Sequence, residues 1–471
     1  MNNNTPYLKV SIIITAHNYA QFLAQCIESA LNQNFNENYE IIVVNDGSID
    51  NTSEILKGYE DNSRIRILNL EGVGLACACN RGIALSKGEY IIRLDADDYF
   101  DENILLVESN LLDRKQDIGM VYCDYHKVNE EGEILDYTRL IKVNNETRLL
   151  NRPPLAAGAM YRKTCYDAIG GYNETLRYQE DYDFWMRFIE RFKVYNINLP
   201  LMYYRQHESS MSKNYEGRMD ARREVKRSFV EKRRLDHKKK IMAIIPAMSS
   251  LRSGIKLPTY NLSGKPVIGY AIQEVLKTKL IDKTIVSTEN ESVARLSRQL
   301  GAEAPFLRPK ELARYSVPIE EVILHAVEYL REKDNYSPDI IALLYFRSIF
   351  LKEKHISEAI HSLFAHNTDS VISVVEDITF HWKPSDAGLK PVGYQKRFLR
   401  EEKEIIYKEN GALYVFRTEN LISKNLLGKK VGYIEMKPYE SIRLETEYDI
   451  WVAKQMIKNS WGQKKKNLKN R

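Results

Sequence analysis

The residues best suited to chemistry are carboxylates that stand directly after an apolar run. Asp95 and Asp97 belong to the stretch DADD, which follows the run Tyr90 to Leu94, apolar at every position but Arg93. Two carboxylates at positions i and i+2, placed at the end of a buried strand, can hold a divalent cation that also contacts phosphate oxygens. The same spacing also occurs in turns that only meet solvent, so the location of the pair in the fold decides its meaning.

The surrounding pattern predicts an open α/β sheet. The run Val10 to Thr15 is rich in β-branched residues and apolar at every position but Ser11 and Thr15, as expected for a central parallel strand covered by helices on both faces. Similar runs alternate with helical patterns along the first hundred residues. We expect strands at 10–15, 40–44, 65–68 and 90–94, and helices near 21–33, 51–59 and 74–86.

Polar residues follow three of these strands at the edge where such sheets bind ligands. In open α/β sheets, ligands bind beyond the carboxyl ends of the strands. We therefore expect a shared crevice formed by the residues after strands one, two and four: Thr15, His17 and Asn18, then Asp46, then Asp95 and Asp97.

A second set of apolar runs begins at Ile241 and predicts a second α/β domain, since 471 residues exceed the usual size of one core. Its expected strands are 241–246, 283–287, 340–344 and 370–375. The predicted organisation is a domain over 1–213, a basic helical linker over 214–240, a domain over 241–460 and a basic disordered tail over 461–471. We interpret the linker as a solvated connector, with binding to an anionic membrane surface as the alternative.

Composition restricts the class of protein. A formal charge of +5 gives no case for nucleic-acid binding. The five cysteines lie in the first half without metal-ligand spacing, which favours reduced thiols in a cytosolic protein. Neither a signal peptide nor an apolar run long enough to span a bilayer is visible. We expect a cytoplasmic protein, and contact with the inner face of the cytoplasmic membrane stays open.

The first half resembles the family 2 glycosyltransferases, which have the GT-A fold. The resemblance runs from about Val10 to Ser212 through the motifs SIIITAHNYAQFLAQCIESALNQ, YEIIVVNDGSIDNTSEIL and ACNRGIALSKGEYIIRLDADD. It implies nucleotide-sugar binding by Thr15, His17, Asn18, Asp46, Asn80 and Asp95, although His17 stands where an aromatic residue is common. It also implies Mg²⁺ or Mn²⁺ at Asp95 and Asp97, with His207 as a further candidate ligand.

The stretch GAMYRKTCYDAIGGYNETLRYQEDYDFWMRF resembles the acceptor side of the same family and implies Asp181 as the catalytic base. Inverting sugar transfer needs a base to deprotonate the acceptor hydroxyl while the diphosphate departs on the opposite side. The alternative is that the acids of EDYDFWMRF only stabilise a helix N-terminus. We expect Trp185 and Phe188 to lie in the core.

The second half resembles the CMP-sugar synthetases, the acylneuraminate cytidylyltransferase family, from about Lys239 to Lys458. The resemblance rests on IIPAMSSLRSGIKLPTYNLSGKPVIGYAI, VSTENESVARLSRQLGAEAPFLRPKELA and YKENGALYVFRTENL. The chain departs from the family at its phosphate loop, where Met248 stands, and at its two metal aspartates, which fall at Arg443 and Glu445. The remaining candidates for a nucleotide loop are Arg252, Lys256 and Asn410.

The sequence therefore predicts two Rossmann-like α/β/α domains, a GT-A glycosyltransferase followed by a degenerate nucleotidyltransferase-like domain. The expected activity is transfer of a sugar, of the hexosyltransferase type, from a UDP-sugar or related donor to a glycan, lipid-linked or protein-linked hydroxyl in bacterial surface glycan synthesis. Two alternatives stay open: a bifunctional transferase and CMP-nonulosonic acid synthetase, and a non-catalytic scaffolding protein. A homodimer through the second domain is a further expectation from the family.

Overall fold

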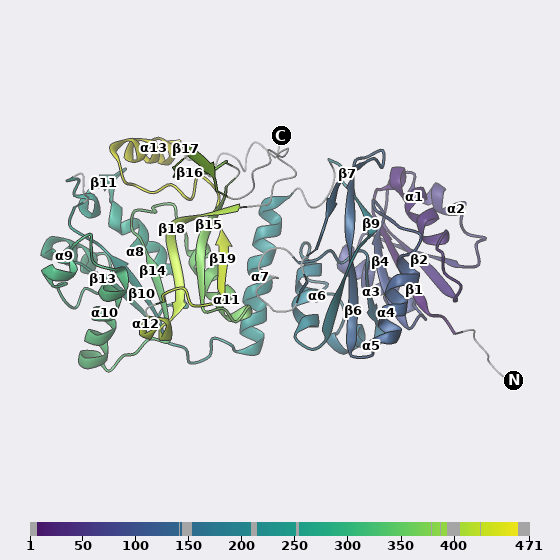
Figure 1. The fold of residues 1–471 in the computed structure, drawn as a ribbon, viewed down its shortest axis with the longest axis horizontal. Coiled ribbons are helices and arrows are strands. Elements are labelled where there is room, and N and C mark those ends of the chain that lie inside the picture. Colours follow the sequence, from purple (N-terminus) through teal and green to yellow (C-terminus); the bar gives the residue numbers. More distant parts are fainter. Residues whose placement is uncertain are drawn as a thin grey trace. The chain divides into compact units, whose positions relative to one another are not determined.

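The computed structural model describes residues 7–140, 142–143, 153–208, 214–250, 254–377, 379–386, 388–392, 406–423 and 425–459. The chain forms two compact units, Met1–Val225 and Lys226–Arg471, here called the N-terminal and C-terminal units (Figure 1). The expected tail at 461–471 and the candidate residue Arg252 lie outside the described residues. Within those residues, no helix has both the length and the apolar character needed to cross a membrane.

The N-terminal unit is built on a nine-stranded mixed sheet in the order β3-β2-β1-β4-β8-β6-β9-β5, with β7 paired to β6. The strands are β1 Val10–Ala16, β2 Tyr39–Asp46, β3 Ile65–Leu70, β4 Tyr90–Asp95, β5 Tyr99–Phe100, β6 Ile118–Val128, β7 Ile134–Thr138, β8 Ala159–Arg162 and β9 Lys193–Arg205. The helices are α1 Ala20–Leu31, α2 Thr52–Lys57, α3 Leu75–Leu85, α4 Ile104–Arg114, α5 Lys163–Ile169 and α6 Glu180–Ile189.

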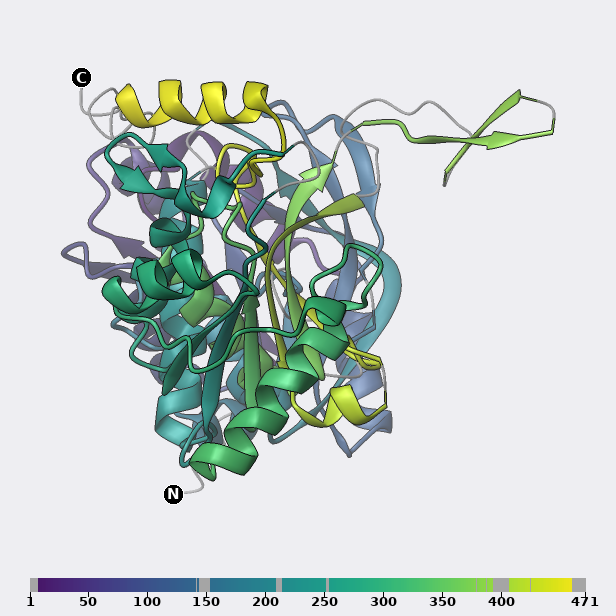
Figure 2. The ribbon, with the colours of Figure 1, turned by 90° about the vertical axis from the view of Figure 1, so that its left-hand side faces the viewer.

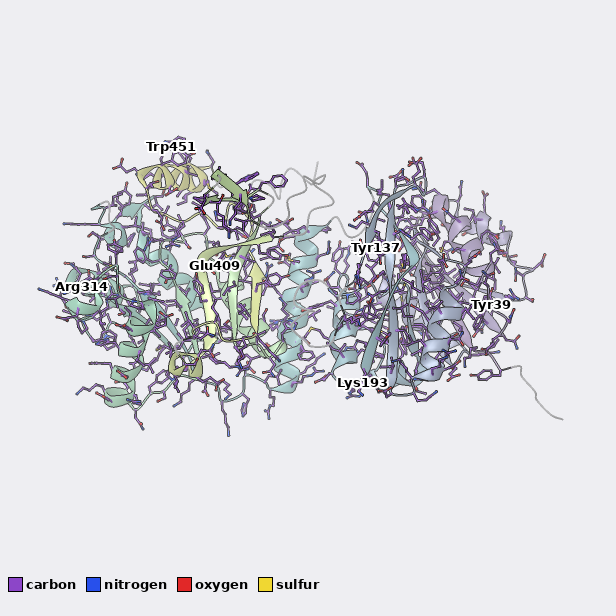
Figure 3. All side chains as sticks on the ribbon, in the orientation of Figure 1. Tyr39, Tyr137, Lys193, Arg314, Glu409 and Trp451 are labelled. Carbon is purple, nitrogen blue, oxygen red and sulfur yellow. The ribbon has the colours of Figure 1, made fainter. Side chains whose placement is uncertain are left out.

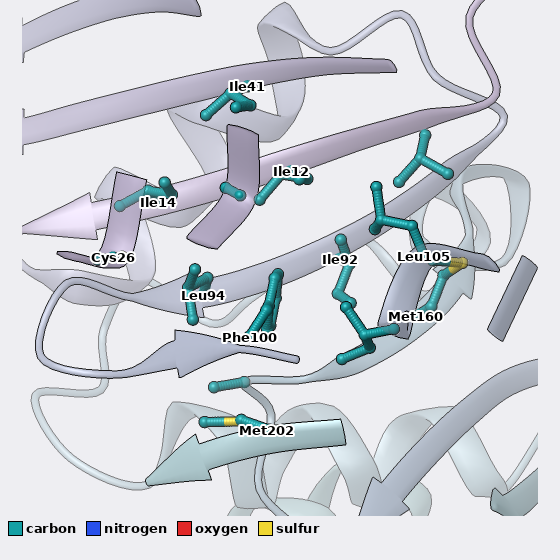
Figure 4. Close-up of a cluster of buried hydrophobic side chains, with 14 of the residues drawn as sticks. Ile12, Ile14, Cys26, Ile41, Ile92, Leu94, Phe100, Leu105, Met160 and Met202 are labelled. Atoms are coloured by element: carbon teal, nitrogen blue, oxygen red, sulfur yellow. The ribbon is translucent and has the colours of Figure 1, made fainter. Parts of the chain in front are cut away.

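Both faces of this sheet are buried, which explains the nearly continuous apolar runs. Along β1, Ile12 and Ile14 belong to one hydrophobic cluster, whereas Ile13 belongs to the cluster on the opposite face. Figure 4 shows the first cluster, in which side chains from β1, β2 and β4 meet those of α1 and α4. Trp185 and Phe188 of α6 are fully buried in the second cluster, so their expected place in the core is confirmed.

The parallel sheet expected from sequence is present but forms only part of the whole. Strands β1 to β4 pair in parallel at the expected places. Beyond β4 the sheet turns mixed, because β8 pairs antiparallel with both β4 and β6. The local hydrophobic pattern carries no information on strand direction, since both kinds of pairing leave the same residues buried.

Helix α7, Tyr215–Arg233, contains the boundary between the two units. The sequence suggested a solvated connector here, and this is wrong for one face of the helix. Val225 and Val230 are buried, and Lys226 is fully buried in an ion pair with Glu358 at 3.1 Å. A few apolar residues and the long stems of basic side chains suffice to bury one face of a highly charged helix.

The C-terminal unit contains a six-stranded sheet in the order β13-β10-β14-β18-β15-β19. Its strands are β10 Ile241–Pro246, β13 Lys283–Ser287, β14 Ile340–Leu344, β15 Ser370–Asp377, β18 Ile406–Arg417 and β19 Val431–Glu435. Two small hairpins pair β11 Asn261–Leu262 with β12 Lys265–Pro266, and β16 Trp382–Ser385 with β17 Gly388–Pro391. The helices are α8 Val267–Lys277, α9 Glu291–Gln299, α10 Ile319–Asp334, α11 Glu353–Ala365, α12 Glu419–Ile422 and α13 Glu447–Lys458. Figure 2 shows the second hairpin extending away from the six-stranded sheet.

Candidate active site

A pocket of about 780 Å³ opens at the carboxyl ends of β1, β2 and β4 in the N-terminal unit. Thr15, Asp46 and Asp95, which stand at or next to the ends of these three strands, all line it. The remainder of the wall comes from the segment before α3, from residues 155–157 and from residues 174–181. Side chains far apart in the sequence thus share one cavity because parallel strands end at one edge of the sheet.

Asp46 closes one side of the pocket by holding the loop before α3. Its two carboxylate oxygens accept hydrogen bonds from the backbone N–H groups of Val73 (2.7 Å) and Gly74 (2.8 Å). The two loops approach so closely that a Cβ on Gly47, whose φ is +66°, would lie 2.6 Å from the backbone nitrogen of Gly72. Glycine is therefore required at position 47 for Asp46 to reach the facing loop.

Arg93 connects the acidic groups from two elements. Its guanidinium donates to both oxygens of Asp95 (2.8 and 3.1 Å) and to Glu180 Oε1 at 3.1 Å. Arg93 and Glu180 are almost completely buried, whereas the Asp95 side chain keeps 30% of its exposure. Burial, and after it the charge of the adjacent Asp181, raise the pKa of Glu180 to about 7, although Arg93 opposes both. The arginine fixes the end of β4 against the start of α6.

Asp97 faces His207 at the other end of the acidic stretch. Its Oδ2 lies 2.9 Å from His207 Nε2, and the imidazole packs against the rings of Tyr19 and Phe22. Burial and the charges of Asp97 and Asp95 raise the pKa of the buried Asp98 well above its ordinary range. The pocket floor thus carries concentrated negative potential, which favours a bound cation.

Asp181 lines the same pocket from the first turn of α6. Its Oδ1 accepts a hydrogen bond from the N–H of Tyr182 at 2.7 Å. Gln179, the residue before the helix, has a left-handed backbone with φ of 62°. The N-terminus of a helix stabilises negative charge, so the local structure suits an ionised carboxylate at this wall.

Two of the expected nucleotide-binding residues do not line the pocket. Asn18 accepts a hydrogen bond from the N–H of Ile49 and braces the neighbouring loop. Asn80 donates hydrogen bonds to the carbonyl oxygen of Tyr172 (2.9 Å) and to the carboxylate of Glu174 (2.8 Å). It therefore positions Glu174, which lines the pocket, without lining the pocket itself. His17 does line the pocket, with its Nδ1 at 2.6 Å from the carbonyl oxygen of Asp46.

Arg93 and Glu180 were not singled out from the sequence as a connected pair. One signal was available: Arg93 is a charged residue inside the otherwise apolar run YIIRL, and a buried arginine needs carboxylate partners. The identity of its second partner, 87 positions away, has no sequence signal.

In the C-terminal unit, the two residues that the resemblance aligns with metal-binding aspartates pair with one another. Arg443 Nε lies 2.7 Å from Glu445 Oε1, and Arg347 approaches the same oxygen at 3.3 Å. Asn410 is buried and engaged with Ser373 (2.6 Å) and Ser441 (2.9 Å). It therefore holds the sheet together and is not free to contact a nucleotide. Lys256 precedes the short helix Leu257–Thr259 and does not line the pocket of this unit.

Comparisons with known proteins agree with this two-part organisation. The glycosyl transferase family 2 model matches residues 11–166, and the cytidylyltransferase model matches residues 242–469. An uncharacterized glycosyltransferase of Rickettsia typhi is 33% identical over 218 residues, which cover 44% of this chain and 67% of that protein. The chondroitin synthase of Pasteurella multocida is 30% identical over 190 residues, covering 40% of this chain and only 20% of the synthase. A crystal structure of S. aureus TarS residues 1–349 is 18% identical, covers 49% of this chain and 69% of that chain, and has a TM-score of 0.40.

Proposed function

Because the chain belongs to glycosyl transferase family 2, its N-terminal unit acts on a nucleotide-sugar, and we propose that it is an inverting, metal-dependent transferase with a hydroxyl acceptor. The observation that carries this proposal is the convergence of Asp95, Asp97 and Asp181 on one pocket. About 780 Å³ is within the range of small-molecule sites and accommodates a nucleotide-sugar.

The donor groups on the pocket floor suit a hard divalent cation such as Mg²⁺ or Mn²⁺. Among the described residues, no group of three or more His, Cys, Asp or Glu side chains is close enough to enclose a metal. Asp97 and His207, with Asp95 beside them, are instead the residues that would hold such a cation. When bound there, the cation would supply positive charge against the departing diphosphate.

The chain's own residues account for the other requirements of the reaction. Asp46 holds the loop of Val73 and Gly74 against the pocket, and we assign this wall to the nucleoside. Asp181 is the base that accepts the proton of the acceptor hydroxyl, which supports inversion at the anomeric carbon. Arg93 contacts Asp95 at the end of β4 and Glu180 at the start of α6, so it holds the two elements at a fixed distance.

We favour a UDP-sugar donor and a role in bacterial surface glycan synthesis. The similarity to a chondroitin synthase supports a polysaccharide product. A thermal-shift screen of nucleotide-sugars with Mn²⁺, on the full chain, would identify the donor: the preferred base should raise the melting temperature of the N-terminal unit more than the other bases do.

Two substitutions test the proposed roles. Asp181→Asn should reduce transfer by about 10²- to 10⁴-fold while sparing donor binding, because it removes only the base. Asp97→Ala should abolish transfer and also weaken Mn²⁺-dependent donor binding. Asp183→Asn is a matched control, since Asp183 lies on the same turn of α6 but pairs with Arg187 and does not line the pocket. Full turnover by Asp181→Asn would remove this carboxylate from the mechanism.

For the C-terminal unit, we propose that cytidylyl transfer has been lost. Glu445 is shared between two guanidinium groups, and a positive charge at Arg443 opposes a divalent cation at the same place. The bifunctional alternative predicts release of pyrophosphate from CTP when the full chain is mixed with a nonulosonic acid and Mg²⁺. Detection of that release would restore the alternative.

A further inference from the structure

Helix α13, Glu447–Lys458, lies along one edge of the C-terminal unit and has two unlike sides (Figure 2). Ile450 and Ala453 face inward and are buried. Tyr448 and Trp451, one turn apart, are 70% and 58% exposed, and their rings stack with centroids 6.2 Å apart. Figure 3 shows Trp451 at the outer side of the helix. Because tryptophan is buried on average, a stacked pair of exposed aromatic rings indicates a contact surface.

The outer side of α13 becomes polar and basic toward the end of the helix. Gln455 and Lys458 are exposed and follow Trp451 at spacings of four and seven, so the three residues share one side of the helix. Lys454 is directed inward instead, where its Nζ donates a hydrogen bond to the Tyr260 hydroxyl at 2.8 Å. The outer side is therefore aromatic in its first half and basic in its last turn.

The acidic residues at the start of α13 do not neutralise this basic end. Asp449 accepts a hydrogen bond from the backbone N–H of Glu445 at 3.0 Å, and the Glu445 side chain pairs with Arg443 at 2.7 Å. Glu447 is exposed, but it lies eleven positions before Lys458, which corresponds to about 16 Å along a helix.

The excess positive charge of the chain is concentrated in the residues that follow α13. Residues 461–471, here called the basic segment, have the sequence WGQKKKNLKNR, with five Lys and Arg, no acidic residue and a further aromatic side chain, Trp461. These five charges equal the formal charge of +5 of the whole chain, because the remaining 64 Lys and Arg are balanced by 64 Asp and Glu. Basic and aromatic residues thus occur together in this part of the sequence.

An anionic lipid surface matches this combination of side chains. Tryptophan and tyrosine favour the membrane interface, where the ring meets acyl chains and the polar group stays with the headgroups. Lysine and arginine nearby are attracted to anionic headgroups. Residues of α13 line neither the pocket of about 780 Å³ nor the smaller one of about 160 Å³ in the C-terminal unit. Small molecules bind in concave sites, whereas the outer side of an edge helix suits a broad and deformable surface.

The three lysines at 238–240 are less suited to the same role. Lys239 is paired with Asp339 at 3.1 Å. The Lys240 ammonium lies 5.5 Å from the centre of the Tyr336 ring. These contacts within the protein compete with any contact between the two lysines and lipid headgroups.

We propose that the outer side of α13, together with the basic segment, binds the surface of a membrane that contains anionic lipids. Tyr448 and Trp451 enter the headgroup level, and Lys458 and the basic segment contact the anionic headgroups. The burial of apolar area and the electrostatic attraction add to one another in such binding. This inference goes beyond the proposed sugar transfer and does not depend on it, since neither donor nor acceptor takes part.

Co-sedimentation of the full chain with vesicles tests the proposal, with phosphatidylcholine alone and with phosphatidylcholine and phosphatidylglycerol in equal parts. We expect binding to the mixed vesicles that weakens as salt is raised, and much weaker binding to phosphatidylcholine alone. The triple variant Lys464→Gln, Lys465→Gln and Lys466→Gln should bind about 100-fold more weakly, at about fivefold for each charge. Trp451→Ser should weaken binding by about 10- to 50-fold, because the exposed ring area no longer enters the interface.

Two matched variants should bind the mixed vesicles as the unchanged protein does. Ile422→Ser removes an apolar side chain that is 87% exposed on α12, at the opposite end of the C-terminal unit from α13 (Figures 1 and 2). The triple variant Lys238→Gln, Lys239→Gln and Lys240→Gln removes the other run of three lysines.

Tryptophan fluorescence tests whether α13 itself meets the lipid. In a protein with Trp382→Phe and Trp461→Phe, only Trp185 and Trp451 remain, and Trp185 is fully buried. Emission should shift to shorter wavelength when mixed vesicles are added, because Trp451 leaves water. Vesicle binding without this shift would refute the placement of α13 at the membrane.

Three other results would also overturn the proposal. The first is absence of binding to the mixed vesicles, or equal binding to the two kinds of vesicle. The second is a self-associated protein that Trp451→Ser converts to monomers in sedimentation velocity, which would show that a second copy of the chain covers α13. The third is loss of binding in the triple variant at 238–240 but not in the triple variant at 464–466.

Discussion

Replacement of Arg93 by methionine should destabilise the N-terminal unit by about 3 kcal/mol at pH 8. The guanidinium makes three contacts with Asp95 and Glu180, between 2.8 and 3.1 Å, and is itself 4% exposed at its side chain. Removing one member of a buried ion pair generally costs about 3–5 kcal/mol, because a charge stays buried without compensation. The lower end of that range applies here, because the Asp95 side chain is 30% exposed. Once the Arg93 guanidinium is removed, water can partly solvate the Asp95 carboxylate.

The cost of Arg93→Met should also depend on pH, in a direction set by Glu180. The pKa of this carboxyl is about 7 while Arg93 opposes its rise, so loss of the arginine raises it further. At pH 6 the variant can therefore protonate Glu180 and relieve the unpaired charge. We expect the destabilisation to be smaller at pH 6 than at pH 8.

Denaturant unfolding followed by Trp185 fluorescence would measure this effect in the unit concerned. Trp185 is fully buried, and the other three tryptophans, Trp382, Trp451 and Trp461, can be changed to phenylalanine because all lie in the other unit. Arg93→Lys is the matched control. It retains the charge but not the fork geometry, and should therefore cost less than Arg93→Met. A change below about 1 kcal/mol at pH 8, or a larger cost at pH 6, would refute the reasoning.

Two further substitutions test the walls of the pocket. Gly47→Ala should destabilise the N-terminal unit by about 2–4 kcal/mol and weaken donor binding, because a Cβ would meet the backbone of the facing loop and φ is positive. The control is Gly170→Ala, where φ is +80° and nothing lies within 4 Å, so that only about 1 kcal/mol of strain is expected. Equal destabilisation in the two variants would contradict the contact between the loops. Glu180→Gln removes a carboxyl whose pKa is higher in the folded than in the unfolded protein. The unchanged protein should therefore lose stability relative to the variant as pH rises from about 5 to about 8. Parallel curves of unfolding free energy against pH for the two proteins would show that Glu180 does not titrate in this range.

The local sequence carried most of the information on elements and on the kind of chemistry. Runs that are apolar at nearly every position, such as Val10–Ala16, require cover on both faces, and this requirement follows from composition over a few residues. The end of each run also marks the end of a strand, so the sequence alone predicted which polar residues stand at the same edge of the sheet. Thr15, Asp46, Asp95 and Asp97 all line the pocket at that edge.

The partners of those carboxylates required the folded chain. Arg93 meets Glu180, Asp97 meets His207, and Asp46 meets the loop at Val73 across separations of 27 to 110 positions. Such contacts depend on the register and direction of strands that pair far apart in sequence, and mixed pairing beyond β4 had no local signal. Asn80 shows the same limit, because only packing decided that its amide turns toward Tyr172 and away from the pocket. The hydrophobic pattern of the sequence determines which residues are buried. Which polar side chains then pair with one another depends on how the strands and helices pack in three dimensions.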